Sequence, residues 1–341
     1  MKKDNHLMAL LSVWGILLVV LGHSGFEEPL IMEKLGGLHS WIYSFHMPLF
    51  FMISGYLFSL TNKSFVEIDA GRFMWKKVLR LLVPYVVLGT VIYFIKFAFA
   101  GLSHASRDFT VGNFLYMFVA PGSENSTMGY LWYIVTLFVV FAIVVLLNKM
   151  RVDMKKTGWC VAVIVCLLVV RQLMPTVKLF NLSAVVHYMP YFVLGILLKE
   201  YEKPVLTFIN RGGYYNVLIF FILSVVLTIW PLSLPMGFGG IFRTLVGIVL
   251  SLSLCSVVLR NEKLSGWLLK WSDKTYSIYI LSWFGLYASK VVCINILHLH
   301  WTIAVAAMFV CQLVVPLVID WIVDICKPLN ESKVVRLIIG Y

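Results

Sequence analysis

Residues 16–60 begin with the apolar run ILLVVLGHSG (16–25) and, after a short polar gap, resume as SFHMPLFFMISGYLF (44–58). Runs of this kind approach the roughly 20 apolar residues that a helix needs to cross a bilayer. Two histidines, His23 and His46, lie at or inside these runs. Because a titratable side chain at membrane depth is costly, each imidazole must be held by polar partners or take part in chemistry.

The rest of the chain has the same apolar character. Hydrophobic residues make up 61% of the 341 positions, and charged residues only 13%. This is too little polar surface for a soluble globule of this size, and the runs are too long for the alternating strands of an outer-membrane barrel. We therefore expect an all-α, polytopic membrane bundle, formed by a single domain over residues 1–341 with no soluble domain.

The apolar runs predict about ten transmembrane helices, with boundaries defined to within several residues. They are residues 7–23, 39–60, 79–99, 130–148, 158–174, 187–200, 215–231, 240–259, 276–296 and 302–325. Of the 28 Lys and Arg residues, 21 fall in the segments on one side, which the positive-inside rule makes cytoplasmic. Both termini are then cytoplasmic, and the net charge of +12 requires no nucleic-acid partner.

Six cysteines lie mostly within or at the ends of the apolar runs and form no C-x-x-C pair. This placement is typical of small core residues rather than of a disulfide framework or a zinc site. We expect no metal.

His23 ends the first predicted span at the outer face, between Gly22 and Ser24, with Glu27 and Glu28 nearby. An imidazole there could act as a general base on a hydroxyl, oriented by a neighbouring carboxylate, and Glu27 is also a candidate substrate-binding residue. The alternative is a histidine that only caps the helix end at the headgroup level.

His46 lies two residues before Pro48, which must free a backbone carbonyl from helical hydrogen bonding. His46 is therefore a second candidate catalytic residue, and the alternative is that its imidazole only satisfies a freed carbonyl.

The segment GRFMWKKVLRLLVPY (71–85) contains a basic run. Arg72, Lys76 and Arg80 are spaced by four residues, which predicts one helical face, with Lys77 alongside. A basic face that enters the membrane on the cytoplasmic side can hold a phosphate-bearing ligand, and arginine does so bidentately. The alternative is attraction to anionic lipid.

Some basic residues lie at or within the predicted outer ends of spans, namely Lys96, Arg171, Arg243 and Lys290. Such charges usually face a cavity or a partner, although long side chains can also extend to water. Arg171, Arg243 and Lys290 are therefore candidate binding residues for an acidic or phosphorylated substrate.

Six motifs in order resemble the membrane acyltransferase-3 family, most closely its fucose 4-O-acetylase-like and exopolysaccharide-modifying branch. They are LVVLGHSG (18–25), FHMPLFFMISGYLF (45–58), Arg80 ahead of LLVPY (81–85), LWYIVTLF (131–138), YMPYFVLGILL (188–198) and YSIYILSWF (276–284). The resemblance extends over nearly the whole chain and is densest in the first 60 residues.

The resemblance implies a multi-pass enzyme of a bacterial-type inner (plasma) membrane. It would move an acyl group, usually acetyl from cytoplasmic acetyl-CoA, onto a hydroxyl of a cell-envelope or extracellular glycan, which is lipid-linked or polymeric. His23 occupies the position of the family's expected catalytic histidine, and the run from Arg72 to Arg80 matches the basic motif of the CoA-facing side.

Two departures from the family pattern bear on this prediction. Ser12 stands eleven residues before His23, where the family usually carries Arg or Lys, and Ser282 replaces a histidine common after the late tyrosine motif. Either other cations such as Lys76, Arg80 or Lys290 substitute, or the protein is a non-catalytic member. The alternative to an enzyme is a protein of a different functional class, a transporter or export partner for a polysaccharide or lipid-linked saccharide.

Overall fold

The computed structural model describes residues 3–62, 68–99, 109–123, 126–234 and 237–340. Over these ranges the chain forms helices joined by short loops and contains no strand, which confirms the predicted all-α class. The helices form two compact units, each discontinuous in sequence. The first unit comprises Met1–Lys63, Lys155–Ile164 and Pro190–Thr275, and the second comprises Ser64–Met154, Val165–Met189 and Tyr276–Tyr341.

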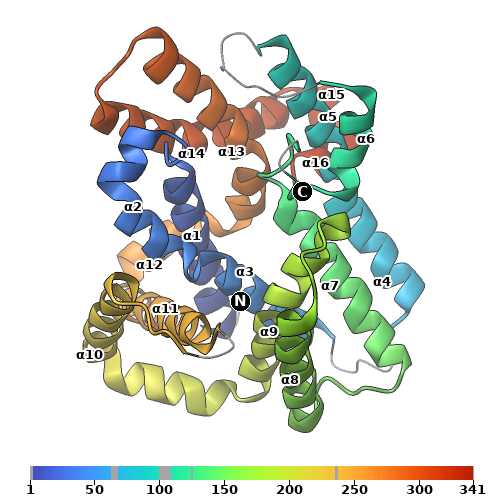
Figure 1. Ribbon diagram of the computed structural model, residues 1–341, viewed down its shortest axis with the longest axis vertical. Coiled ribbons are helices and arrows are strands. Elements are labelled where there is room, and N and C mark those ends of the chain that lie inside the picture. Colours follow the sequence, from blue (N-terminus) through green and yellow to red (C-terminus); the bar gives the residue numbers. More distant parts are fainter. Residues whose placement is uncertain (1–2, 63–67, 100–108, 124–125, 235–236, 341) are drawn as a thin grey trace. The chain divides into compact units, whose positions relative to one another are not determined.

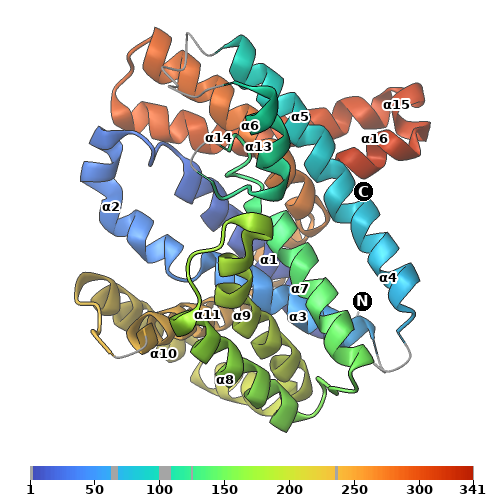
Figure 2. The ribbon, with the colours of Figure 1, turned by 45° about the vertical axis from the view of Figure 1, so that its right-hand side comes forward.

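The first unit contains the predicted catalytic histidines. Its elements are α1 (Lys3–His23), α2 (Pro29–Tyr43), α3 (His46–Thr61), α10 (Glu202–Ile229), α11 (Phe238–Val258), α12 (Glu262–Leu269) and the short η4 (Ser272–Lys274). It also takes the start of α8 (Thr157–Leu173) and most of α9 (Leu182–Glu200). Figures 1 and 2 show α10 and α11 packed side by side within this unit.

The second unit contains the basic run. Its elements are α4 (Ala70–Lys77), η1 (Val78–Leu82), α5 (Val83–Ala98), α6 (Val111–Val119), α7 (Trp132–Lys149), η2 (Leu179–Asn181), α13 (Thr275–Lys290), η5 (Val291–Ile296), α14 (Trp301–Ile325), α15 (Lys327–Glu331) and α16 (Lys333–Ile338). It also takes the end of α8 and the start of α9.

Eight helical segments of the described chain are long and apolar enough to cross a membrane, as a polytopic protein requires. They cover eight of the ten predicted spans: His6–His23, Ala70–Ala98, Trp132–Lys149, Leu179–Glu200, Glu202–Ile229, Phe238–Val258, Glu262–Ile296 and Trp301–Ile325. The predicted span 158–174 corresponds to α8, a shorter apolar helix. The remaining one, 39–60, requires a correction.

Residues 39–60 were expected to form one helix, but α2 ends at Tyr43 and α3 begins at His46. The cause is Pro48, which has no N–H to donate to the carbonyl of Ser44, four residues earlier. That carbonyl instead accepts a hydrogen bond from the hydroxyl of Thr244 on α11, at 2.7 Å. The break is thus stabilised by a side chain about 200 residues away in the sequence.

Helices α3 and α9 approach each other closely at two glycines of the first unit. A Cβ atom on Gly55 would lie 1.9 Å from the carbonyl oxygen of Phe192, and one on Gly195 would lie 1.9 Å from that of Met52. Small residues at a helix crossing are a common packing device in membrane proteins. The crossing holds the backbone of α3 directly against that of α9.

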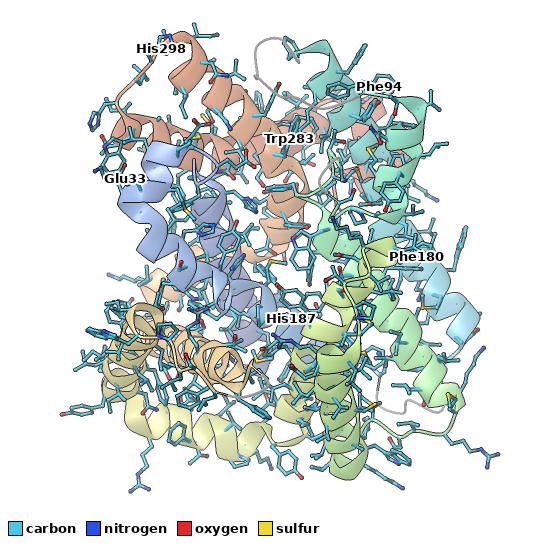
Figure 3. All side chains as sticks on the ribbon, in the orientation of Figure 1. Glu33, Phe94, Phe180, His187, Trp283 and His298 are labelled. Atoms are coloured by element: carbon cyan, nitrogen blue, oxygen red, sulfur yellow. The ribbon has the colours of Figure 1, made fainter. Side chains whose placement is uncertain are left out.

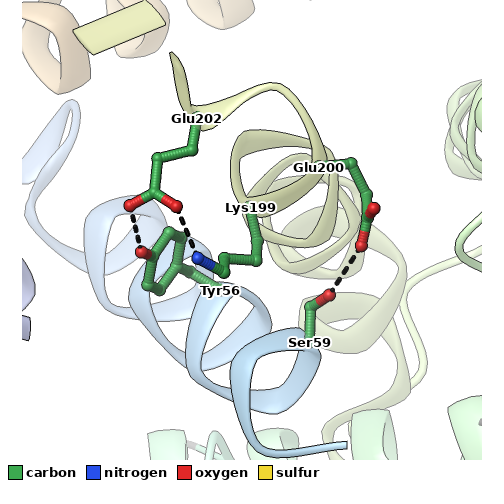
Figure 4. A network of polar contacts seen from close by, with 5 residues as sticks. All are labelled: Tyr56, Ser59, Lys199, Glu200 and Glu202. Atoms are coloured by element: carbon green, nitrogen blue, oxygen red, sulfur yellow. Dashed lines mark hydrogen bonds and ion pairs between the residues drawn. The ribbon is translucent and has the colours of Figure 1, made fainter. Parts of the chain in front are cut away.

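Polar contacts hold the far end of α3 to the junction of α9 and α10 (Figure 4). The hydroxyl of Tyr56 donates to the Glu202 carboxylate at 2.5 Å, and Lys199 forms an ion pair with the same carboxylate. The hydroxyl of Ser59 donates to the Glu200 carboxylate at 3.1 Å. These contacts anchor the end of α3 opposite to His46.

A π-helical segment, η1, interrupts the basic run in the second unit. The N–H of Val83 bonds to the carbonyl of Val78, five residues earlier, so the turn is wider than that of an α-helix. The run from Arg72 to Arg80 is therefore not one regular α-helix: its last residues lie in a π-helical turn. Arg72 and Lys76 lie on α4, whereas Arg80 lies within the widened turn.

Candidate active site

Three histidines gather around the ring of Tyr43 in the first unit. The ring centroid of Tyr43 lies 3.8 Å from that of His39, 4.7 Å from that of His46 and 6.2 Å from that of His23. We refer to these four residues as the histidine cluster. They come from the end of α1, the last turns of α2 and the first residue of α3, so three helix ends meet at one point.

The chain reversal after α1 brings His23 into the cluster. Gly25 has a φ of 86°, a left-handed conformation that glycine adopts without strain, and its N–H bonds to the carbonyl of His23 at 2.7 Å. A Cβ atom on Gly22 would lie 3.0 Å from the Tyr43 ring, and the Tyr43 hydroxyl donates to the Gly22 carbonyl at 3.4 Å. The two glycines therefore let α2 fold back closely against the end of α1.

His46 is buried at the break between α2 and α3. Its Nδ1 lies 2.9 Å from the carbonyl oxygen of Ile42. Because a carbonyl can only accept, Nδ1 carries the hydrogen and Nε2 of the neutral ring is an acceptor. The imidazole thus satisfies a helix-end carbonyl, and it keeps one basic nitrogen directed elsewhere.

Glu27 and His39 set the charges around His23. Glu27, an exposed residue in the reversal after α1, interacts electrostatically with His23, as does His39. His39 lies on α2, outside the eight candidate spans, and partial burial lowers its pKa below the usual value. Of these two neighbours, Glu27 favours the protonated form of the His23 imidazole and a protonated His39 would oppose it.

Ser12, the departure eleven residues before His23, adds no charge to the first unit. Its hydroxyl donates to the carbonyl of Met8 on its own helix at 2.9 Å. The site is thus built without a cation at this position of α1.

The four residues of the basic run differ in their surroundings. Arg72, Lys76 and Arg80 are exposed. Lys77 is half-buried, with its ammonium 4.0 Å from the ring centroid of Phe141 and 5.0 Å from that of Phe73. The three exposed cations are available to a phosphate, whereas Lys77 is occupied by aromatic faces.

Arg80 is held by α13. The hydroxyl of Tyr276 donates to the Arg80 carbonyl at 2.8 Å, and the guanidinium lies 5.8 Å from the Tyr276 ring centroid. Pro84, four residues after Arg80, cannot donate to that carbonyl, so Tyr276 replaces the lost backbone bond. Tyr276 thereby positions the last cation of the run.

The predicted substrate-binding residues fall in both units. Glu27 and Arg243 lie in the first unit, and Arg171 and Lys290 lie near the ends of α8 and α13 in the second. The Nε atom of Arg243 is buried without a hydrogen-bond partner among the described residues. Lys96, grouped with them in the sequence, donates to the Thr127 carbonyl at 3.1 Å and lies 5.4 Å from the Trp283 ring, so its charge serves the fold.

The sequence that forms these two units matches a known protein family. The model of the acyltransferase domain of the acyltransferase-3 family matches residues 10–321, well over half of the chain. The chain belongs to the acyltransferase-3 family. It is a membrane acyltransferase, and the match runs through both units. No curated protein and no solved structure matches the chain significantly.

The sequence predicted His23 and His46 as residues of this site, but it did not predict that His39 and Tyr43 lie beside them. The signal available was the i, i+4 spacing of His39 and Tyr43, which places both on one face of α2. A single helix over residues 39–60, as the apolar pattern predicted, gave no reason to bring Tyr43 to His23. The break at Ser44 turns these residues toward the end of α1.

Proposed function

We propose that this acyltransferase is an O-acetyltransferase of the exopolysaccharide-modifying type. It moves an acetyl group from cytoplasmic acetyl-CoA to a hydroxyl of a cell-envelope or extracellular glycan, in a bacterial-type inner membrane. The observation that carries the proposal is the histidine cluster of an acyltransferase-3 family member. It presents His23 at the end of a candidate span, with a carboxylate and two further imidazoles around it.

His23 acts as the general base in this mechanism. Its imidazole takes the proton of the acceptor hydroxyl as the oxygen attacks the thioester carbonyl, and Glu27 stabilises the imidazolium that forms. The tetrahedral intermediate then expels the CoA thiolate, which recovers the proton from His23. The products are the glycan ester and CoA, and the imidazole returns to its neutral state.

His46 is the second catalytic candidate, with a supporting role. Its Nδ1 is engaged by Ile42, so its contribution is confined to Nε2 and to fixing the ring of Tyr43 beside it. Because only Nδ1 of the buried ring is hydrogen-bonded to Ile42, Nε2 can relay the proton from the acceptor hydroxyl toward bulk solvent.

The basic run binds the donor. Arg72, Lys76 and Arg80 are exposed cations on the predicted cytoplasmic side, and the phosphates of acetyl-CoA are ligands of the right charge. Asp69 caps α4 by accepting from the N–H of Arg72 at 3.1 Å, which fixes the start of the basic helix.

The decisive experiment compares His23→Asn with His298→Asn, a matched change at an exposed histidine of the second unit. Purified protein in lipid nanodiscs receives radiolabelled acetyl-CoA and envelope glycan, and acetylated glycan is counted. His23→Asn should lower transfer by about 10²–10⁴-fold, the usual contribution of a general base, while His298→Asn transfers normally. Equal rates in both variants contradict the proposal.

The same variants test the export alternative in cells. Mass spectrometry of surface glycans should show that His23→Asn cells export the glycan in normal amounts without the acetyl group. Loss of export with unchanged acetylation would identify a transporter instead.

A further inference from the structure

A second group of aromatic and polar side chains gathers in the second unit. The ring centroids of Trp132, at the start of α7, and Tyr188, in the second turn of α9, lie 5.1 Å apart, with their planes tilted by 36°. His187 lies beside Tyr188, with centroids 4.6 Å apart, and Arg171 in the last turn of α8 interacts electrostatically with His187. We refer to these four residues as the aromatic platform.

The loop between α8 and α9 holds the platform in place. The side-chain amide of Asn181 donates to the hydroxyl of Thr136 on α7 at 2.8 Å, and the N–H of Val177 donates to the hydroxyl of Ser183 at 2.7 Å. Thr136 lies one turn after Trp132 on the same face of α7. The start of α9, labelled at His187 in Figure 3, is therefore tied to the part of α7 that carries Trp132.

Three polar side chains of the platform have unused hydrogen-bonding capacity. Trp132, Arg171 and His187 are each partly buried. Their indole N–H, guanidinium and ring nitrogens form no hydrogen bond or ion pair with any residue in the described ranges. The donors and acceptors of these three side chains are therefore available to a ligand that binds beside the aromatic pair.

The side chains of the aromatic platform are chemically suited to bind a sugar. The faces of an indole and a phenol offer apolar, rigid contact to the C–H face of a pyranose ring, while the ring hydroxyls need donors and acceptors at its edge. Arg171 and the Trp132 N–H supply donors, and a neutral His187 supplies an acceptor as well as a donor. A lipid chain would leave all three unpaired, and a lone phosphate would leave the two aromatic faces unused.

We propose that Trp132, Arg171, His187 and Tyr188 form a saccharide-binding subsite that receives a pyranose ring of the acceptor glycan. The inference rests on the proposed function in that the bound sugar belongs to the chain that is acylated. The first residues of α7 and α9 and the end of α8 all lie on the side that the basic residues predict to be outer, where an envelope glycan is found.

Saturation-transfer NMR on the full chain in nanodiscs tests the subsite. The probes are the methyl glycosides of glucose, galactose, fucose and glucuronic acid at millimolar concentration. At least one glycoside should receive saturation at its ring protons, with a fivefold or greater loss in Trp132→Leu and Arg171→Gln. Trp132→Phe should retain most of the signal, because it keeps an aromatic face.

Trp230→Leu is the matched control, because Trp230 is an exposed tryptophan at the end of α10. If Trp132→Leu does not fold, Arg171→Gln and His187→Asn carry the test. A glycoside signal equal in these variants and in Trp230→Leu, or no signal from any probe, overturns the subsite.

Acetyl transfer measured on the same samples separates the two proposals. Trp132-dependent glycoside binding without any acetyl transfer leaves the subsite standing and removes the proposed function. Acetyl transfer whose KM for the acceptor is unchanged in Arg171→Gln leaves the function standing and removes the subsite. An increase of about tenfold in that KM, with unchanged kcat and an unchanged KM for acetyl-CoA, supports both.

Discussion

The hydroxyl of Tyr276 lies 2.8 Å from the carbonyl oxygen of Arg80 and donates a hydrogen bond to it. Pro84 has no N–H to offer that carbonyl, so a residue of α13 completes the backbone hydrogen bonding of a helix that precedes it by almost 200 positions in the chain. A similar repair occurs in the first unit, where Thr244 bonds the Ser44 carbonyl that Pro48 leaves free.

Tyr276→Phe should lower the free energy of unfolding by about 1–3 kcal/mol, because the Arg80 carbonyl loses its partner while the aromatic contact remains. Unfolding by SDS titration measures this. Tyr287→Phe is the control on the same helix, since the buried Tyr287 hydroxyl has no partner among the described residues. It should be neutral or stabilising, and a loss equal to that of Tyr276→Phe would contradict the assignment.

Thr244→Val should destabilise the protein by about 1–3 kcal/mol, since the Ser44 carbonyl is buried and would remain unpaired. It should also slow acetyl transfer, because Ser44 lies at the break that sets His46 and Tyr43 in place. SDS titration and the transfer assay measure the two effects. In the matched change Thr228→Val, the lost bond runs only to Ser224 of the same helix, so both effects should be small.

Gly55→Ala should prevent stable folding, because the added methyl group would lie 1.9 Å from the Phe192 carbonyl oxygen and α9 would have to move away from α3. The yield of monodisperse protein after detergent extraction measures this. In Gly37→Ala the new methyl group meets nothing within 4 Å, and the loss of a helical glycine should stabilise α2 by about 0.5–1 kcal/mol. A normal yield of Gly55→Ala would show that the α3–α9 crossing is looser than described.

Arg80→Gln should raise the KM for acetyl-CoA by about 10–100-fold, the loss expected when one hydrogen bond to a charged group, worth about 1.5–3 kcal/mol, is removed. The acceptor KM should not change. Steady-state kinetics with varied acetyl-CoA measures this. Arg151→Gln, at an exposed arginine of the same unit, serves as the control. Equal KM values in the two variants would exclude Arg80 from donor binding.

The hydrogen bonding at the break near Ser44 could be predicted from the sequence only in part. Pro48 indicated that a carbonyl would be freed, and His46 was the nearest polar group in the sequence. In the structure the freed carbonyl is bonded by Thr244, and His46 bonds Ile42 instead. Periodicity within a short window carries no information about a partner 200 residues away, so neither the partner nor the resulting turn of Tyr43 toward His23 could be derived.

The sequence by itself determined that this protein is a helical membrane protein, because long apolar runs with few charges allow no other way to satisfy the backbone in lipid. Its ordered motifs also predicted the acyltransferase-3 family, which the family comparison confirmed. Only the tertiary structure decided that His39 and Tyr43 join His23 and His46, that Tyr276 positions Arg80, and that Trp132 and Tyr188 form a platform. The physical reason is that prolines, a π-helical turn and close glycine contacts redirect the helices, and the compensating hydrogen bonds come from remote parts of the chain.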